Sequence, residues 1–270
     1  MAKHLVTQRT RSVIPSLFTS MNLFSGFIAI KTAFVDGDFV NAAWFIVLGA
    51  IFDTLDGLMA RLTRSASEFG VELDSLADVV TFGVAPSAII YKIFFYQYAG
   101  FGMLIAALPA ICGALRLARF NVQLTGFDKE YFRGLPIPSS ALFIVSFVVF
   151  HYRTHSPSFI AAGTYDALMF VVTIGASLLM VSTVKYEAMP KFSRRAIAEH
   201  PAKFIAIVLA VIAAIVTSGN AIFPMLFVFV LAGVIRASVR RTKRFITDRR
   251  AAALFDEEEL EQDDRQTLGM

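Results

Sequence analysis

Four aspartates lie in two closely spaced pairs within an otherwise apolar chain of 270 residues. Asp53 and Asp56 are three residues apart, and Asp74 and Asp78 are four apart, so each pair lies on one face of a helix. Folding the chain about residue 65 would bring Asp53 level with Asp78, and Asp56 level with Asp74. The spacing therefore predicts that four carboxylates converge on one small volume.

Carboxylates that converge inside an apolar chain need a source of positive charge. A single charged side chain at the centre of a bilayer costs roughly 2.5–3.5 kcal/mol on insertion scales, and neighbouring like charges disfavour each other's ionisation. Arg61, the nearest basic residue in the sequence, neutralises only one carboxylate. Two divalent cations would neutralise all four, and ligands that are all oxygen suit Mg²⁺ or Mn²⁺ better than zinc.

The elements that position these aspartates are predicted to be membrane-spanning helices. Hydrophobic residues make up 56% of the chain and charged residues only 17%, which is typical of a polytopic all-α membrane protein. The net charge of +4 therefore does not indicate nucleic-acid binding. Apolar stretches of about 20 residues, the length that crosses a bilayer, predict about eight spans: 15–35, 39–60, 72–96, 100–119, 136–152, 159–183, 203–219 and 221–238.

The basic residues predict the orientation of these spans. When both termini are placed in the cytoplasm, all of the 25 Lys and Arg residues except Lys31, Lys92 and Arg153 fall on the cytoplasmic side. This asymmetry requires an even number of spans. It places the aspartates just below the cytoplasmic surface.

The aspartates belong to a longer pattern of eight specified positions. The pattern is Asp53-x2-Asp56-Gly57-x2-Ala60-Arg61-x8-Gly70-x3-Asp74-x3-Asp78. It resembles, without departure, the signature of the CDP-alcohol phosphotransferase family. The resemblance implies an integral membrane enzyme that displaces CMP from a CDP-linked lipid or alcohol with a second alcohol.

The resemblance also implies a role for each signature residue. Two metal ions would be held by the aspartates, with Asp78 both near the metals and acting as general base. A carboxylate at the edge of the site is suited to removing the proton of an attacking alcohol, and bridging metals stabilise charge on a diphosphate. The remaining signature residues would contact the CDP group: Gly57, Ala60, Arg61 and Gly70.

Four further stretches resemble the branch of this family that makes phosphatidylserine. They are "IPSLFTSMNLFSGFIAI" (14–30), "SLADVVTFGVAPSA" (75–88), "GALRLARFN" (113–121) and "GLPIPSSA" (134–141). The resemblance implies transfer of a phosphatidyl group from CDP-diacylglycerol to L-serine, with release of CMP. Acceptors such as glycerol 3-phosphate or inositol phosphate are the alternative within the same chemistry. A divalent-cation transporter is the alternative from another class.

A serine acceptor needs a positive group for its carboxylate. Arg116 and Arg119 lie about one turn apart at the cytoplasmic end of the fourth predicted span, and arginine binds carboxylate or phosphate in a bidentate manner. Anchoring to lipid headgroups is the alternative role for both. Thr19 and Asn22, in the first span, would hydrogen-bond the nucleotide or orient an aspartate, and polar bonds between helices are the commoner alternative for such residues.

The resemblance and the charge pattern together predict the organisation of the chain. Residues 1–238 form a transmembrane catalytic domain, with its core at about 12–183. Residues 239–270 form a charged cytoplasmic tail, because a basic run is followed there by an acidic run. We expect a homodimer in the plasma membrane of a prokaryote, with membrane lipids around it and the active site facing the cytoplasm.

Overall fold

The computed structural model of the chain is built from helices, and no strand occurs among the residues that it describes. The chain divides into two units, Met1–Phe227 and Val228–Met270, and the site lies in the first. The described residues are 2–63, 67–125, 134–153, 162–182, 184, 209, 212–239 and 242.

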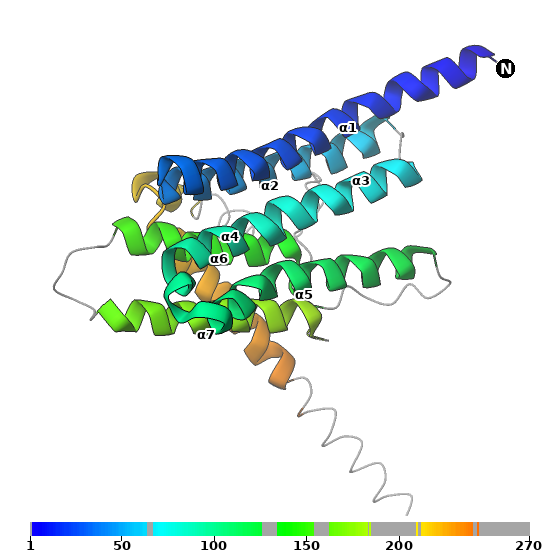
Figure 1. The fold of residues 1–270 in the computed structure, drawn as a ribbon. Helices are drawn as coiled ribbons and strands as arrows, with labels where there is room; N and C mark the ends of the chain where they lie inside the picture. Colours follow the sequence, from blue (N-terminus) through cyan, green and yellow to red (C-terminus); the bar gives the residue numbers. More distant parts are fainter. Residues whose placement is uncertain are drawn as a thin grey trace, which may run out of the picture. The chain divides into compact units, whose positions relative to one another are not determined.

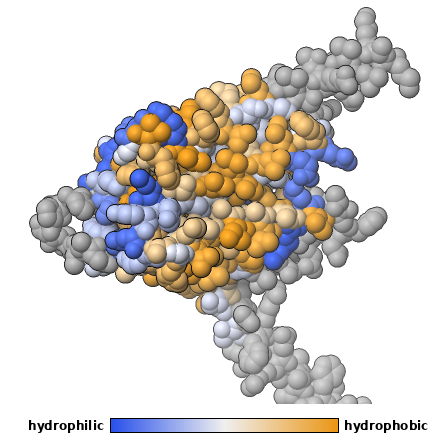
Figure 2. Space-filling view, in the orientation of Figure 1, coloured by the Kyte–Doolittle hydropathy of each residue, from blue (hydrophilic) through white to orange (hydrophobic). Residues whose placement is uncertain are grey.

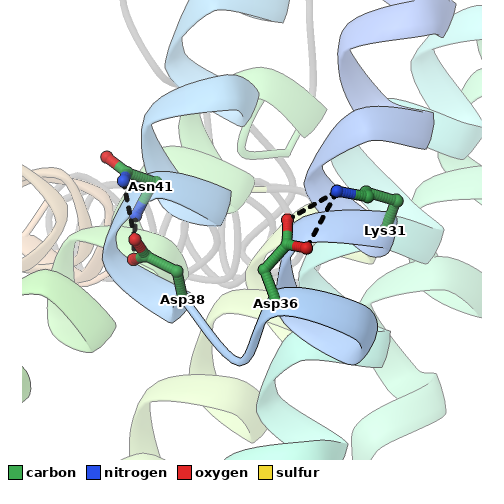
Figure 3. Close-up of polar contacts among 4 residues, drawn as sticks. All are labelled: Lys31, Asp36, Asp38 and Asn41. Atoms are coloured by element: carbon green, nitrogen blue, oxygen red, sulfur yellow. Dashed lines mark hydrogen bonds and ion pairs between the residues drawn. The ribbon is translucent and has the colours of Figure 1, made fainter.

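The first two helices form an antiparallel pair (Figure 1). Helix α1 spans Ala2–Lys31, helix α2 spans Phe39–Thr63, and the π-helical turn η1, Thr32–Asp36, lies between them. The close-up in Figure 3 shows how polar residues fix this turn. Lys31 Nζ forms an ion pair with Asp36 at 2.7 Å, and Asp38 Oδ1 accepts a hydrogen bond from the Asn41 N–H at 2.9 Å. Asp38 thereby caps the first turn of α2.

The next helical run reverses direction at Tyr96–Ala99. Ala99 has a positive φ of 48°, and helix α5 begins there and returns alongside the preceding run. Gly83 shows the antiparallel contact, because a Cβ added there would lie 3.2 Å from Ala110 Cα. The segments of this run are α3 (Glu68–Asp78), η2 (Val79–Val84), α4 (Ala85–Ile90), η3 (Tyr91–Phe95), η4 (Tyr96–Tyr98) and α5 (Ala99–Thr125).

Two more helices contribute to the core of the first unit. Helix α6 spans Ile137–Arg153 and helix α7 spans Ala162–Val181, and α7 lies beside α5 (Figure 1). The aromatic rings of Phe94 and Phe147 lie 6.0 Å apart between η3 and α6. Both rings are almost fully buried, so this interface is well packed.

The entry into α6 depends on a glycine. Gly134 has a φ of +90°, and a Cβ at this position would collide with the Met180 carbonyl oxygen. The adjacent Leu135 N–H donates a hydrogen bond of 2.9 Å to the Leu179 carbonyl, which ties the start of α6 to the end of α7.

Replacing Gly134 with alanine should therefore destabilise the protein. Both the left-handed backbone and the collision oppose the substitution, so we expect a loss of about 1–3 kcal/mol, seen as a lower midpoint of thermal unfolding in detergent. Gly175→Ala in α7 is the matched control, because a Cβ there meets nothing within 4 Å and alanine favours the helix. Equal stability of the Gly134 variant and the wild type would contradict this explanation.

The prediction of a polytopic helical membrane protein is confirmed. Among the described residues, five helical stretches are long and apolar enough to cross a membrane, and Ile137–Arg153 is a shorter apolar helix. Figure 2 shows an apolar band across the middle of the visible face, with hydrophilic residues at both ends. The five stretches are Pro15–Asp36, Phe39–Thr63, Glu68–Val122, Thr164–Val181 and Ile222–Val239.

The structure refines the predicted spans in one respect. The spans predicted at 72–96 and 100–119 form the two limbs of the 55-residue stretch Glu68–Val122, which reverses at the predicted boundary. Residues 203–208, 210 and 211 of the predicted span 203–219, and nearly all of the predicted tail 239–270, lie outside the described residues. The count of eight spans and the cytoplasmic placement of both termini therefore stay predictions.

Candidate active site

Three of the four predicted aspartates meet between helices α2 and α3. Asp53 and Asp56 come from α2, and Asp74 comes from α3. One carboxylate oxygen from each of the three lies within 4.8 Å of the others. The three-residue spacing in α2 directs both of its carboxylates toward α3, and the connection between the helices brings Asp74 level with them.

Asp78 lies beside this group, one turn further along α3. Its side chain is buried, and its Oδ1 accepts a hydrogen bond of 3.1 Å from Asn22 Nδ2. It is close enough to Asp53 and Asp74 for their charges to interact. The geometry therefore separates Asp78 from the three converging carboxylates while keeping it within their electrostatic reach.

Helix α1 supplies one hydrogen-bond partner to each aspartate pair. Thr19 Oγ1 lies 3.0 Å from Asp56 Oδ2 and is the donor, and Asn22 donates to Asp78. Both donors are buried, and their three-residue spacing puts them on one face of α1. The sequence left open contact with the nucleotide, orientation of an aspartate and polar bonding between helices, and the observed contacts join α1 to aspartates of α2 and α3.

Thr81, in η2, holds α1, α2 and η2 together beside Asn22. The sequence did not indicate this role. Thr81 Oγ1 donates a hydrogen bond of 2.9 Å to the Asn22 carbonyl. A Cβ added at Gly26 or at Gly49 would lie 2.6 Å from a Thr81 side-chain atom. Glycines on the two neighbouring helices therefore leave room for the Thr81 side chain. This close packing fixes η2, which directly follows the helix that carries Asp78.

A second contact that the sequence analysis missed joins α5 to α3, the helix that carries Asp74 and Asp78. Asn121 Nδ2 donates a hydrogen bond of 3.0 Å to Ser75 Oγ. Ser75 lies between Asp74 and Asp78 in sequence, so this bond restrains the turn that carries both. The signal was present, because Ser75 and Asn121 each lie in a stretch that resembles the phosphatidylserine-forming branch.

The small residues of the signature have different surroundings. A Cβ at Gly57 would meet nothing within 4 Å, so there is open space beside Asp56. The Gly70 N–H instead donates a hydrogen bond of 3.1 Å to Ser67 Oγ, the N-cap of α3. Ala60 is half-buried, whereas Arg61 is exposed.

The two arginines predicted to act together contact different parts of the protein. Arg116 Nε is buried without a hydrogen-bond partner among the described residues, and its guanidinium group is close enough to Asp78 for their charges to interact. Arg119 is exposed, and its Nη1 donates a hydrogen bond of 3.3 Å to the Val181 carbonyl at the end of α7. Arg116 therefore faces the site, whereas Arg119 caps a neighbouring helix.

The aspartate group has the properties of a metal site. Within the part of the chain that the structure describes, none of the four aspartates forms a salt bridge. Asp74 Oδ1 is buried and has no hydrogen-bond partner among the described residues. Three converging carboxylates without a basic partner fit a hard divalent cation, which prefers oxygen ligands.

The comparison with known families identifies the class of protein that this fold and site define. The model of the CDP-alcohol phosphatidyltransferase family matches residues 12–175, so the chain belongs to this family of membrane enzymes. The resemblance seen in the sequence is thereby confirmed.

Similar proteins make the comparison more specific. A CDP-diacylglycerol–serine O-phosphatidyltransferase of Helicobacter pylori is 42% identical over 183 residues, which cover 67% of this chain and 73% of the relative. A Bacillus subtilis protein of the same name is 37% identical over 68% of this chain and 93% of its own. An archaetidylserine synthase of Methanothermobacter thermautotrophicus is 38% identical over 64% of this chain and 69% of its own.

Proposed function

We propose that this chain transfers the phosphatidyl group of CDP-diacylglycerol to the hydroxyl of L-serine, forming phosphatidylserine and releasing CMP. The convergence of Asp53, Asp56 and Asp74 inside a membrane-embedded helical bundle is the observation that carries this proposal. Relatives that are named as serine phosphatidyltransferases, from bacteria, support serine as the acceptor.

In this proposal the aspartates share the work of binding and proton transfer. Asp53, Asp56 and Asp74, with Asp78 at the edge, hold two divalent cations, Mg²⁺ or Mn²⁺. When bound, these cations neutralise the carboxylates and stabilise negative charge on the diphosphate. Carboxylate ligands from two different helices fix the position of this charge relative to the membrane.

Asp78 acts as the general base. Its carboxylate takes the proton of the serine hydroxyl while the serine oxygen bonds to the phosphorus of the phosphatidyl group. The bond between that phosphorus and the CMP oxygen breaks, and CMP leaves with the electron pair. The hydrogen bond from Asn22 holds the carboxylate in place for this transfer.

The CDP group binds along the signature face of α2. The open space at Gly57 leaves room for a nucleotide or phosphate beside Asp56. The small side chain of Ala60 leaves room at the next turn of α2, and the exposed Arg61 contacts a phosphate or the nucleotide. Gly70 lies opposite, at the start of α3, where its capping bond to Ser67 also shapes the helix end.

The placement in the cell follows from the charge asymmetry and the substrates. We propose that residues 1–238 form the membrane domain, with a catalytic core at about 12–183 and a charged tail at 239–270. The site opens to the cytoplasm of a prokaryotic cell at the plasma membrane, where serine and CMP exchange through water. The lipid substrate enters from the membrane, and the enzyme acts as a homodimer.

An acceptor screen tests the proposed reaction. Purified protein is given CDP-diacylglycerol and one acceptor at a time: L-serine, glycerol 3-phosphate, inositol phosphate or choline. We expect CMP release with serine at a rate at least about a hundredfold above the others, because a site built for a charged amino acid leaves its polar groups unpaired with the wrong acceptor. CMP release with a phosphorylated acceptor and none with serine would contradict the proposal.

A further inference from the structure

Three buried hydroxyl groups on α6 and α7 form no hydrogen bond among the described residues that would explain their burial. Ser140 has 1% of its surface exposed, and Thr173 and Ser177 have none. None of the three hydroxyls has a hydrogen-bond partner among the described residues. A buried hydroxyl without a partner costs free energy, so its retention points to a ligand that supplies the missing hydrogen bond.

The two hydroxyls of α7 face α5. Asp166 and Phe170 lie on the same helical stripe as Thr173 and Ser177, since they follow one another at intervals of four, three and four residues. Asp166 accepts a hydrogen bond from Gln97 at 3.0 Å, and Phe170 stacks on Phe101 of α5. Because these neighbours belong to η4 and α5, the stripe that carries both hydroxyls points to that side.

The facing stripe of α5 carries Arg116. Phe101 contacts α7 at one end of this stripe, and Arg119 reaches the Val181 carbonyl at the other. Arg116 is one helical turn before Arg119 and lies between these two contacts. Its buried Nε lacks a partner among the described residues, as the hydroxyls do.

Ser140 reaches the same region from α6. Ile137, one turn earlier, packs so closely on α5 that a Cβ at Gly113 would collide with it. The hydrogen bond from the Leu135 N–H to the Leu179 carbonyl sets the antiparallel register of α6 and α7. Counting from that bond at 1.5 Å per residue puts Ser140 at the depth of Thr173 and Ser177.

We propose that Ser140, Thr173 and Ser177, the hydroxyl cluster, bind the amino-acid part of the acceptor together with Arg116. This inference rests on the proposed function and specifies where its acceptor is held. The guanidinium group of Arg116 pairs with the acceptor carboxylate, and the hydroxyls accept hydrogen bonds from its ammonium group or donate to its carboxylate. Arg116 also lies near Asp78, so an acceptor held here presents its own hydroxyl to the proposed base.

The test is the kinetics of two conservative variants, Thr173→Val and Ser177→Ala. We expect KM for L-serine to rise about tenfold in each, the effect of losing a hydrogen bond to a charged group. KM for CDP-diacylglycerol stays unchanged. The midpoint of thermal unfolding stays the same or rises, because each change removes an unpaired buried hydroxyl. Thr173→Ser keeps the hydroxyl and should retain the low KM for serine.

Ser146→Ala is the matched control on α6. Ser146 is buried, as Ser140 is, but its hydroxyl already donates a hydrogen bond of 2.8 Å to the Phe143 carbonyl. Its replacement should leave KM for serine unchanged. An unchanged KM for serine in both α7 variants would overturn the inference, as would a rise confined to KM for CDP-diacylglycerol.

The wild type separates this inference from the proposed function. If it forms no phosphatidylserine from serine and CDP-diacylglycerol, the proposed function fails and the inference fails with it. If it forms phosphatidylserine while the α7 variants keep the wild-type KM for serine, only the inference fails.

Discussion

Replacing Asp78 with asparagine is expected to lower the rate of CMP release by about 10²–10⁴-fold, the usual contribution of a general base. The amide has nearly the shape of the carboxylate, and its carbonyl oxygen still accepts the hydrogen bond from Asn22. It does not take a proton from the serine hydroxyl. CDP-diacylglycerol should therefore still bind with little loss of affinity.

The measurement is CMP release together with a separate assay of CDP-diacylglycerol binding in the same preparation. Asp166→Asn is a suitable control. The Asp166 carboxylate is on α7, where it accepts a hydrogen bond from Gln97, and it does not belong to the aspartates of the site. This control should retain wild-type activity. If the Asp78 variant loses binding and turnover to the same degree, Asp78 acts only in binding or structure, and the general-base assignment fails.

Removing divalent cations should have the second large effect. We expect EDTA to reduce activity to background, since three carboxylates without a salt bridge among the described residues would be left facing the diphosphate of the substrate. Added Mn²⁺ or Mg²⁺ should restore activity, whereas Zn²⁺ should restore little, because the ligands are all oxygen. The readout is CMP release after dialysis and after each addition.

A variant distinguishes loss of a metal ligand from general damage to the protein. Asp56→Asn keeps an oxygen that accepts the hydrogen bond from Thr19 but removes the negative charge. We expect this variant to need a much higher concentration of Mn²⁺ for half-maximal activity. Full activity of the wild type in metal-free buffer would rule out the proposed metal chemistry.

The acidic site was predictable because its signals are local in sequence. The spacings within the two pairs place Asp53 with Asp56 and Asp74 with Asp78 on helical faces, and a short connection between α2 and α3 makes the two faces meet. Helix periodicity and chain reversal suffice for that inference. The observed approach of Asp53, Asp56 and Asp74 follows the predicted register.

Contacts that depend on packing between distant helices were not predictable in the same way. Nothing in the sequence specifies that Thr81 fits between Gly26 and Gly49, because this requires the positions of three helices. The same holds for the arginines. Arg116 and Arg119 are about one turn apart, yet Arg119 does not join Arg116 at the site. It donates a hydrogen bond to the Val181 carbonyl at the end of α7.

The helical geometry near the site also departs from a uniform pattern. The run after Asp78 is π-helical over Val79–Val84, and Thr81 lies within it. Such segments change the direction of the following side chains and often occur near functional sites. Hydropathy predicts an apolar stretch here, but it carries no signal for this local change.

Counting bound Mn²⁺ tests the central claim most directly. Electron paramagnetic resonance during titration of purified protein with Mn²⁺ gives the number of ions bound per chain, independently of turnover. The account predicts two bound ions per wild-type chain, and fewer or weaker sites in Asp74→Asn, which alters a carboxylate of the converging group whose Oδ1 is buried. Wild-type protein that binds no Mn²⁺ and yet releases CMP at its full rate would contradict the account.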